Sequence, residues 1–196
     1  MKKLNPKKDK AIFVDIDGTL IEEVSDIHDP KDVKLLPFVG ENIQMLNKDF
    51  LIIAITNKSS IEKGYCSEGD LAKIFRKIKK ELVSYNARID RIYYCPHREE
   101  SDCQCRKPKT QLIFNSLKEF EKIDLNKSWL IGDKSRDIQL GVNLKNLGYR
   151  DFKTIGLETG HGINDREFNV KPDFYVKNFS EAAKIIKGQA SIIHTT

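Results

Sequence analysis

An apolar run that ends in two aspartates constrains this chain more than any other feature. Residues 11–20 read Ala-Ile-Phe-Val-Asp-Ile-Asp-Gly-Thr-Leu. Four consecutive apolar residues followed by polar ones are typical of a short strand that is buried on both faces. Asp15 and Asp17 are then expected at the carboxyl end of this strand, where open α/β sheets bind their ligands.

The spacing of the two aspartates suits phosphoryl-transfer chemistry. A carboxylate can attack phosphorus and form an aspartyl-phosphate, but the substrate is anionic, so a bridging Mg²⁺ ion is a natural requirement. Asp15 is the candidate nucleophile. Asp17 is the candidate general acid and then general base, and its backbone carbonyl can contact the metal where the chain turns at Gly18. The alternative is a strand that ends in an ordinary Asp-Gly turn.

Length and composition favour a single globular domain. The chain has 196 residues, of which 39% are hydrophobic and 32% charged. We predict a basic, solvated arm at residues 1–10, one domain at residues 11–187, and a flexible tail at residues 188–196. No apolar run approaches the roughly 20 residues that span a bilayer, and no secretion signal precedes Asp15. We expect a cytoplasmic monomer with no membrane partner.

The formal net charge of +5 says little about partners. Much of the excess lies in residues 1–10, and the other Lys and Arg residues are dispersed, without the basic-aromatic pattern of RNA-binding domains. We therefore expect no nucleic-acid partner, although a positive field favours phosphate substrates. The rival interpretation, a nucleic-acid-binding protein, predicts steeply salt-dependent binding.

Strand-like and helix-like segments alternate along the chain, which predicts a doubly wound, mostly parallel sheet in a three-layer, Rossmann-like α/β fold. No second block is large enough for a cap domain, so the polar residues 20–36 are expected to form a small flap over the site. Ser67 and Ser180 are the expected caps of two helices. The further predicted strands are 50–55, 89–94, 128–131, 152–156 and 174–176, and the predicted helices are 37–46, 67–82, 109–120, 134–145 and 180–187.

Polar residues also follow two of the other predicted strands. The Thr56 hydroxyl and the Asn57 amide can hydrogen-bond phosphate oxygens, although Thr-Asn is also ordinary turn chemistry at a strand end. Asp133 follows the fourth strand and can complete an oxygen shell for Mg²⁺ with Asp15 and the Asp17 carbonyl. The sequence thus predicts a magnesium site with three protein ligands.

Basic residues flank the same predicted site. Arg106 and Lys107 precede the third main helix, where a cation can neutralise a transferring phosphoryl group and hold the nucleophile; the alternative is a solvated basic loop. Lys134 is expected to reach the substrate. Asp137 lies one helical turn further on, either as a second carboxylate behind the metal site or as a favourable charge near a helix N-terminus, and we favour the second interpretation.

Three of the four cysteines cluster with a histidine within eleven residues. Cys95, His97, Cys103 and Cys105 supply the closed tetrahedral shell of a structural Zn²⁺ ion, because no position is left for water. A disulfide is disfavoured in a protein without a secretory signal, and the alternative is a loop of reduced, metal-free cysteines. Zinc would brace the loop 95–105, which carries Arg106 and Lys107 into the site. Cys66 is expected to be an ordinary buried thiol.

Together these motifs resemble the haloacid-dehalogenase-like phosphohydrolases. The resemblance spans residues 11–162 and rests on Asp-x-Asp-Gly-Thr at 15–19, Thr56, the Lys107 segment and Gly-Asp-x-x-x-Asp at 132–137. It implies that Asp15 is the nucleophile, that Thr56 and Lys107 bind the phosphoryl group, and that Mg²⁺ is the cofactor.

The cysteine cluster resembles two small, cap-less groups of that superfamily, the D-glycero-D-manno-heptose 1,7-bisphosphate 7-phosphatases and the histidinol-phosphate phosphatases. The segment 56–65, the run 92–97 and Lys134 favour the heptose group, whereas the short zinc loop and the run 105–109 also occur in the histidinol group. The heptose resemblance implies a phosphorylated-sugar substrate and a place in surface-polysaccharide precursor synthesis.

Four positions depart from the patterns of these groups: Ile16 stands in place of Arg, Lys58 of Gln, Ser60 of Gly and Lys63 of Arg. All four are expected near the substrate, so they bear on its identity. Thr159-Gly160-His161-Gly162 resembles a loop near the site, in which His161 is interpreted as a loop residue. A rival of another class is a zinc-bearing binding module without catalysis.

Overall fold

The computed structural model describes residues 8–24, 26–160 and 170–188. Within them the chain forms a sheet of six parallel strands in the order β3-β2-β1-β4-β5-β6. The strands are β1 (Ala11–Val14), β2 (Leu51–Asn57), β3 (Arg91–Cys95), β4 (Trp129–Gly132), β5 (Lys153–Leu157) and β6 (Phe174–Val176). The predicted doubly wound α/β fold is confirmed.

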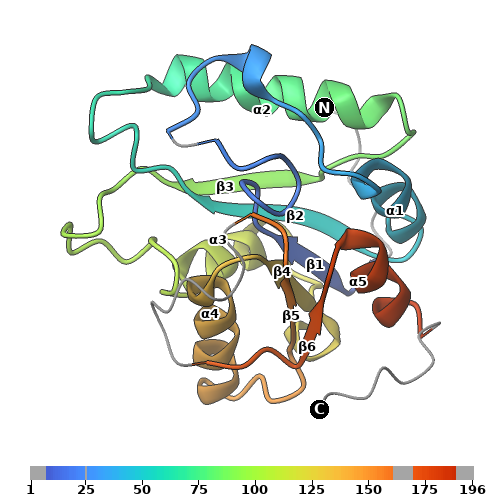
Figure 1. The fold of residues 1–196 in the computed structure, drawn as a ribbon. Coiled ribbons are helices and arrows are strands. Elements are labelled where there is room, and N and C mark those ends of the chain that lie inside the picture. The colour runs from blue at the N-terminus through green and yellow to red at the C-terminus, as the bar shows by residue number, and fades with distance from the viewer. Residues whose placement is uncertain (1–7, 25, 161–169, 189–196) are drawn as a thin grey trace.

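Helices cover both faces of the sheet and make three layers (Figure 1). One face carries α1 (Val39–Leu46), α2 (Glu68–Val83) and α5 (Phe179–Ile186), and the other carries α3 (Gln111–Glu119) and α4 (Ser135–Asn146). Short 3-10 helices lie at Pro30–Asp32 and Leu125–Lys127. Within the described residues no helix is both long and apolar enough to cross a bilayer.

The position of β1 in the middle of the sheet explains why its sequence is apolar. Ile12 and Val14 join the core cluster beneath α1, α2 and α5, whereas Ala11 and Phe13 join the cluster beneath α3 and α4. All four side chains are fully buried, because alternate residues of a strand point to opposite faces and both faces are covered. Burying each of the larger side chains stabilises the fold by about 1.5–3 kcal/mol.

The order of the strands places the predicted polar residues at one edge. β1 pairs with β2 on one side and with β4 on the other, with Val14 level with Ala54 and Ile131. From β1 the chain adds β2 and β3 on one side and then crosses over to add β4, β5 and β6 on the other. The boundary between β1 and β4 is therefore the switch point of a doubly wound sheet. The residues that follow β1 and β4 therefore meet at the carboxyl edge, beside the end of β2.

The flap and the helix caps test finer sequence predictions. Ile21 of the predicted flap makes an isolated bridge to Asp17 of the site loop and a second one to Leu35 near the other end of the flap. Ser67 caps α2 by accepting the Asp70 N–H at 3.1 Å, as predicted. The prediction of Ser180 as the cap of α5 is wrong: Asn178 accepts the Glu181 N–H at 3.1 Å, because the helix begins one residue before Ser180.

The last residues of the predicted N-terminal arm pack on the domain. Lys8 is 9% exposed and its ammonium donates to the Phe50 carbonyl at 2.9 Å, while the Lys10 ammonium lies 4.5 Å from the centre of the Phe50 ring. The charge of residues 8–10 thus serves local contacts. The rest of the predicted arm, nearly all of the predicted tail, and His161 lie outside the described residues.

Candidate active site

Asp15 lies at the end of β1 in a buried ion-pair network. Its Oδ1 accepts the Ile16 N–H at 2.7 Å and lies 2.8 Å from the Lys107 ammonium. That ammonium also lies 2.7 Å from Asp137 Oδ1 and donates to the Ile55 carbonyl at 2.9 Å, so each of its three N–H groups has a partner. Burial alone would raise the pKa of Asp15, but Lys107 and Lys134 outweigh it and hold the pKa below its ordinary value. Asp15 is thus kept as a carboxylate.

Asp137 has a larger part in this network than the sequence indicated. Its Oδ2 accepts the Lys134 N–H at 3.2 Å and so caps α4, which agrees with the interpretation as a charge at a helix N-terminus. It is also fully buried against Lys107. Burial raises the pKa of Asp137 to about 6, with Asp15 adding repulsion and Lys107 opposing both. Asp137 is therefore both a charge at the α4 N-terminus and a carboxylate behind the site.

Asp133 follows β4 and is fully buried. Its Oδ1 accepts the Thr19 hydroxyl at 3.2 Å. A Cβ atom on Gly18 would lie 2.4 Å from its carboxylate, and one on Gly160 would lie 2.3 Å away, so both glycines are needed for this close approach. Burial raises the pKa of Asp133 to about 8, and repulsion from Asp15 and Asp137 adds to the effect.

Asp15 and Asp133 fit a hard divalent cation, with Asp137 close by but bonded to Lys107 and to the Lys134 N–H. One oxygen from each of Asp15, Asp133 and Asp137 lies within 4.8 Å of the others. Lys107 offsets part of their charge, but Asp15 and Asp137 still repel Asp133 and add to the effect of burial on its pKa. A cation with a preference for oxygen ligands, such as Mg²⁺, would relieve this repulsion.

Asp17 faces two residues at the end of β2. The Thr56 hydroxyl lies 3.5 Å from Asp17 Oδ2. The Lys58 ammonium lies 2.8 Å from Oδ1 and 2.6 Å from Oδ2 of the same carboxylate. The sequence predicts Lys58 near the substrate but not this ion pair, because the two residues are 41 positions apart.

The remaining predicted substrate residues fall into two groups. Both polar atoms of the Asn57 amide bond the backbone of Lys107, at 3.1 and 3.0 Å, so Asn57 positions that lysine. Arg106 donates to the His97 carbonyl at 3.2 Å and faces the pocket, as does Lys134. Lys134 reaches Glu23 of the flap at 3.0 Å, and its pKa is raised because Asp15, Asp133 and Glu23 together outweigh burial.

A polar cavity of about 650 Å³, including open solvent at its mouth, lies over Asp17. Its walls come from the flap, the turn after β2, Arg106 and the start of α4, which matches the prediction that residues 20–36 cover the site. Of the four departures from the family patterns, Lys58, Ser60 and Lys63 line this cavity, whereas Ile16 is fully buried in the core. The lining residues are Asp17, Glu23, Val24, Asp26, Ile27, Asn57, Lys58, Ser59, Ser60, Lys63, Arg106, Lys134 and Arg136.

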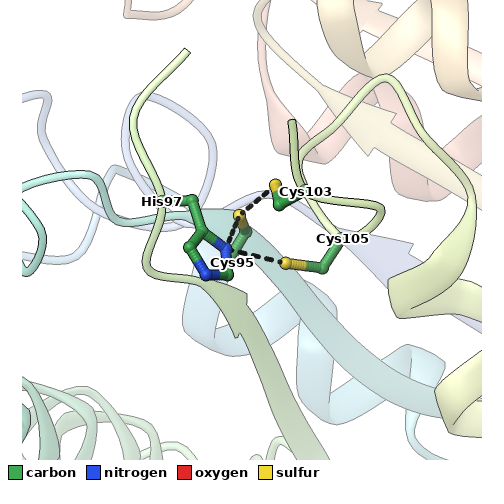
Figure 2. Close-up of side chains that lie close together, drawn as sticks. All are labelled: Cys95, His97, Cys103 and Cys105. Carbon is green, nitrogen blue, oxygen red and sulfur yellow. Dashed lines mark hydrogen bonds between the residues drawn. The ribbon is translucent and has the colours of Figure 1, made fainter. Parts of the chain in front are cut away.

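The four predicted zinc ligands converge at the end of β3 (Figure 2). The His97 Nδ1 atom lies 3.5 Å from Cys95 Sγ and 3.3 Å from Cys105 Sγ, and Cys95 Sγ lies 3.6 Å from Cys103 Sγ. A tetrahedral Zn²⁺ ion with Zn–S bonds of about 2.3 Å needs S···S edges of about 3.8 Å. The cluster is therefore close to the size of a zinc shell.

The cysteine loop is tied to the turn that carries Lys58. The Glu62 carboxylate accepts the Ser101 hydroxyl at 2.7 Å and the Arg98 N–H. The Lys58 N–H donates to the Cys95 carbonyl at 2.7 Å. A metal bound by the cysteine loop would therefore steady the wall of the cavity as well as Lys107.

The sheet order and the site residues define a haloacid-dehalogenase-like phosphohydrolase fold. A sequence model of the family described as polynucleotide kinase 3 phosphatase matches residues 10–175. The chain belongs to this family.

Individual relatives agree with the family assignment. The chain is 35% identical over 166 residues to D-glycero-beta-D-manno-heptose-1,7-bisphosphate 7-phosphatase of Haemophilus influenzae, covering 80% of this chain and 89% of the relative. It is 31% identical to the enzyme of the same name from Pasteurella multocida, covering 93% and 99%. The fold matches the crystal structure of D,D-heptose 1,7-bisphosphate phosphatase from B. bronchiseptica in complex with magnesium and phosphate, with a TM-score of 0.81, 23% identity, and coverage of 92% and 99%.

Proposed function

We propose that this chain is a Mg²⁺-dependent phosphomonoesterase that removes the 7-phosphate of D-glycero-D-manno-heptose 1,7-bisphosphate through an aspartyl-phosphate. The observation that carries the proposal is the buried network in which Lys107 holds Asp15 beside Asp133 at the carboxyl edge of the sheet. The relatives from H. influenzae and P. multocida, which are named for this reaction, support the choice of substrate.

The reaction has two in-line steps. Asp15 attacks phosphorus, the bond between phosphorus and the sugar oxygen breaks, and Asp17 gives its proton to that oxygen. Water then attacks the aspartyl-phosphate, Asp17 takes a proton from the water, and inorganic phosphate leaves as Asp15 is restored. The same carboxyl group thus acts first as an acid and then as a base.

Mg²⁺ would be held by the carboxylates of Asp15 and Asp133 and by the Asp17 carbonyl, and would supply positive charge toward the phosphate oxygens. Lys107 keeps Asp15 ionised and in place.

Thr56 is proposed to donate a hydrogen bond to the transferred group. Arg106 and Lys134 line the cavity above it and are proposed to bind the rest of the substrate. Asn57 acts on the site by fixing the backbone of Lys107.

Zn²⁺ is proposed to bind Cys95, His97, Cys103 and Cys105 with a structural role, because the protein fills every position of the shell. We further propose a cytoplasmic monomer that takes part in the synthesis of surface-polysaccharide heptose precursors, such as those of lipopolysaccharide. Nucleic acid and membranes are not among the proposed partners.

The test is phosphate release from a panel of substrates, with Mg²⁺ or with a chelator. The panel holds both anomers of heptose 1,7-bisphosphate, histidinol phosphate and a 3′-phosphorylated oligonucleotide. We expect Mg²⁺-dependent release of the 7-phosphate to be fastest by kcat/KM. Preference for histidinol phosphate or the oligonucleotide would refute the substrate assignment, and no release from any of them would favour a non-catalytic binding module.

A further inference from the structure

Lys58 is a buried cation that depends on Asp17 for its counter-charge. Its side chain is 5% exposed, and its ammonium contacts both carboxylate oxygens of Asp17 at 2.6 and 2.8 Å. Its backbone is fixed as well, because the Lys58 N–H donates to the Cys95 carbonyl at 2.7 Å. The ammonium therefore has little contact with bulk water in this arrangement.

This ion pair cannot stay as it is during the proposed reaction. Asp17 has to give a proton to the leaving oxygen, so one of its oxygens must face the substrate and carry hydrogen. An ammonium that loses an acceptor in a buried place is costly unless another acceptor replaces it. Lys58 lines the substrate cavity, so a group of the bound substrate can supply the replacement.

The charges of the cavity indicate that this replacement is anionic. Two of the carboxylates in the wall pair with other lysines, Glu23 with Lys134 at 3.0 Å and Asp26 with Lys63 at 3.8 Å. Neither pair contains a group that reacts, so both can persist while substrate is bound. The wall holds five cationic side chains, Lys58, Lys63, Arg106, Lys134 and Arg136, against three carboxylates, Asp17, Glu23 and Asp26.

We propose that Lys58 is a specificity-determining residue that binds a second phosphoryl group of the substrate, on the leaving-group side of the phosphate that is removed. The inference rests on the proposed phosphatase function and names a residue that selects its substrate. Substrates with the second phosphoryl group take over Lys58 and free Asp17 for proton transfer. Substrates without it leave Lys58 on Asp17 and react more slowly.

The positive charge at position 58 distinguishes this chain from the pattern that the surrounding segment resembles. In the pattern that residues 56–65 resemble, Gln stands in place of Lys58, and a neutral amide can hydrogen-bond a phosphoryl group without offsetting its charge. Lys58→Gln is therefore a conservative change in size that removes the charge, both toward a phosphoryl group and toward Asp17.

The experiment compares two substrates that differ only in the second phosphoryl group, heptose 1,7-bisphosphate and heptose 7-phosphate. We expect kcat/KM of the unaltered protein to be higher for the bisphosphate by about tenfold or more, the size of one charge-assisted hydrogen bond. Lys58→Gln should reduce this ratio by about tenfold, whereas Lys58→Arg should retain most of it. The control is Lys34→Gln, which removes the same charge from an exposed position outside the cavity and should leave the ratio unchanged.

Three results would overturn the inference. One is a ratio near one in the unaltered protein, which needs no variant and so decides the matter even if Lys58→Gln fails to fold. The second is an equal fall in kcat/KM for both substrates in Lys58→Gln. The third is a fall in the ratio of the two kcat/KM values in Lys34→Gln that is as large as the fall in Lys58→Gln. Failure of the proposed function has a different signature. The unaltered protein would then release no phosphate from either heptose or from p-nitrophenyl phosphate, or it would prefer histidinol phosphate or the oligonucleotide to both heptoses.

Discussion

The Lys107 ammonium lies 2.8 Å from the Asp15 carboxylate, and both side chains are buried. Lys107 also pairs with Asp137 at 2.7 Å, so one cation holds two carboxylates that would otherwise repel each other. Burial alone would lower the pKa of Lys107, but Asp137 and Asp15 outweigh it and raise the pKa. The candidate nucleophile is thus positioned before any substrate arrives.

Removal of this cation is expected to destabilise the fold. Lys107→Met leaves Asp15 and Asp137 buried without a counter-charge, and breaking a buried pair in this way costs about 3–5 kcal/mol. Urea denaturation near pH 7 measures the free energy of unfolding. Adding Asp137→Asn to Lys107→Met should recover part of the loss, because it removes one of the stranded charges. Simple addition of the two single losses would contradict the coupling.

Asp15→Asn is expected to abolish phosphate release while the protein stays folded, because a neutral amide cannot form the acyl phosphate. We expect a fall in kcat of about a thousandfold or more. The matched control is Asp9→Asn, since Asp9 is half-exposed and pairs with Lys127 away from the site. Substantial activity in Asp15→Asn would show that the nucleophile is another group.

The raised pKa of Asp133, about 8, predicts a pH-dependent stability. Between about pH 4 and pH 8 the native state binds this proton and the unfolded chain does not, so the metal-free protein loses stability as the pH rises. Asp133→Asn should remove this loss and be more stable than the unaltered protein at pH 8 by at least about 1 kcal/mol. The two should converge toward pH 4.

Thermal unfolding across this pH range, with a chelator and then with Mg²⁺, checks both halves of the prediction for Asp133. Mg²⁺ should stabilise the unaltered protein most at the upper end of the range, because the ion binds the ionised carboxylate, and it should have little effect on Asp133→Asn. An equal response to Mg²⁺ in both proteins would remove Asp133 from the proposed metal site.

Sequence patterns were sufficient for the features that short segments determine. The apolar runs located the strands, and parallel pairing then required Asp15 and Asp133 to share one edge. The spacing of Cys95, His97, Cys103 and Cys105 placed them in one cluster, which the structure shows.

Contacts between distant residues were not predictable in this way. The pair of Lys58 with Asp17 depends on the path of the turn after β2. The pair of Lys107 with Asp137 needs α4 packed against the segment that carries Lys107, where the Asn143 amide of α4 donates to the Pro108 carbonyl at 3.0 Å. The sequence also could not tell which residue caps α5. Asn178 and Ser180 are both of a type that caps helices, and the structure shows Asn178 at the cap.

Cys103→Ser is expected to lower zinc content and stability together. Burial raises the pKa of the Cys103 thiol, but hydrogen bonds that include the Arg106 N–H outweigh it and lower the pKa to about 7, which suits a metal-binding thiolate. Because metal binding adds directly to folding free energy, we expect a loss of about 3 kcal/mol or more. Cys66→Ser is the control, since Cys66 lies outside the cluster, and it should retain the metal. Full zinc content in Cys103→Ser would exclude this ligand set.

Gly18→Ala tests the close approach of the turn to Asp133. Gly18 and Gly64 both have φ of +78°, so alanine at either position is strained by about 1–2 kcal/mol. They differ in their surroundings: a Cβ on Gly18 would lie 2.4 Å from the Asp133 carboxylate, whereas one on Gly64 would meet nothing within 4 Å. Both variants should therefore lose similar backbone stability, but only Gly18→Ala should displace Asp133 and reduce Mg²⁺-dependent phosphate release, by about a hundredfold. Equal activity in the two variants would mean that Asp133 can move aside without loss, and the proposed metal site would then need a different third ligand.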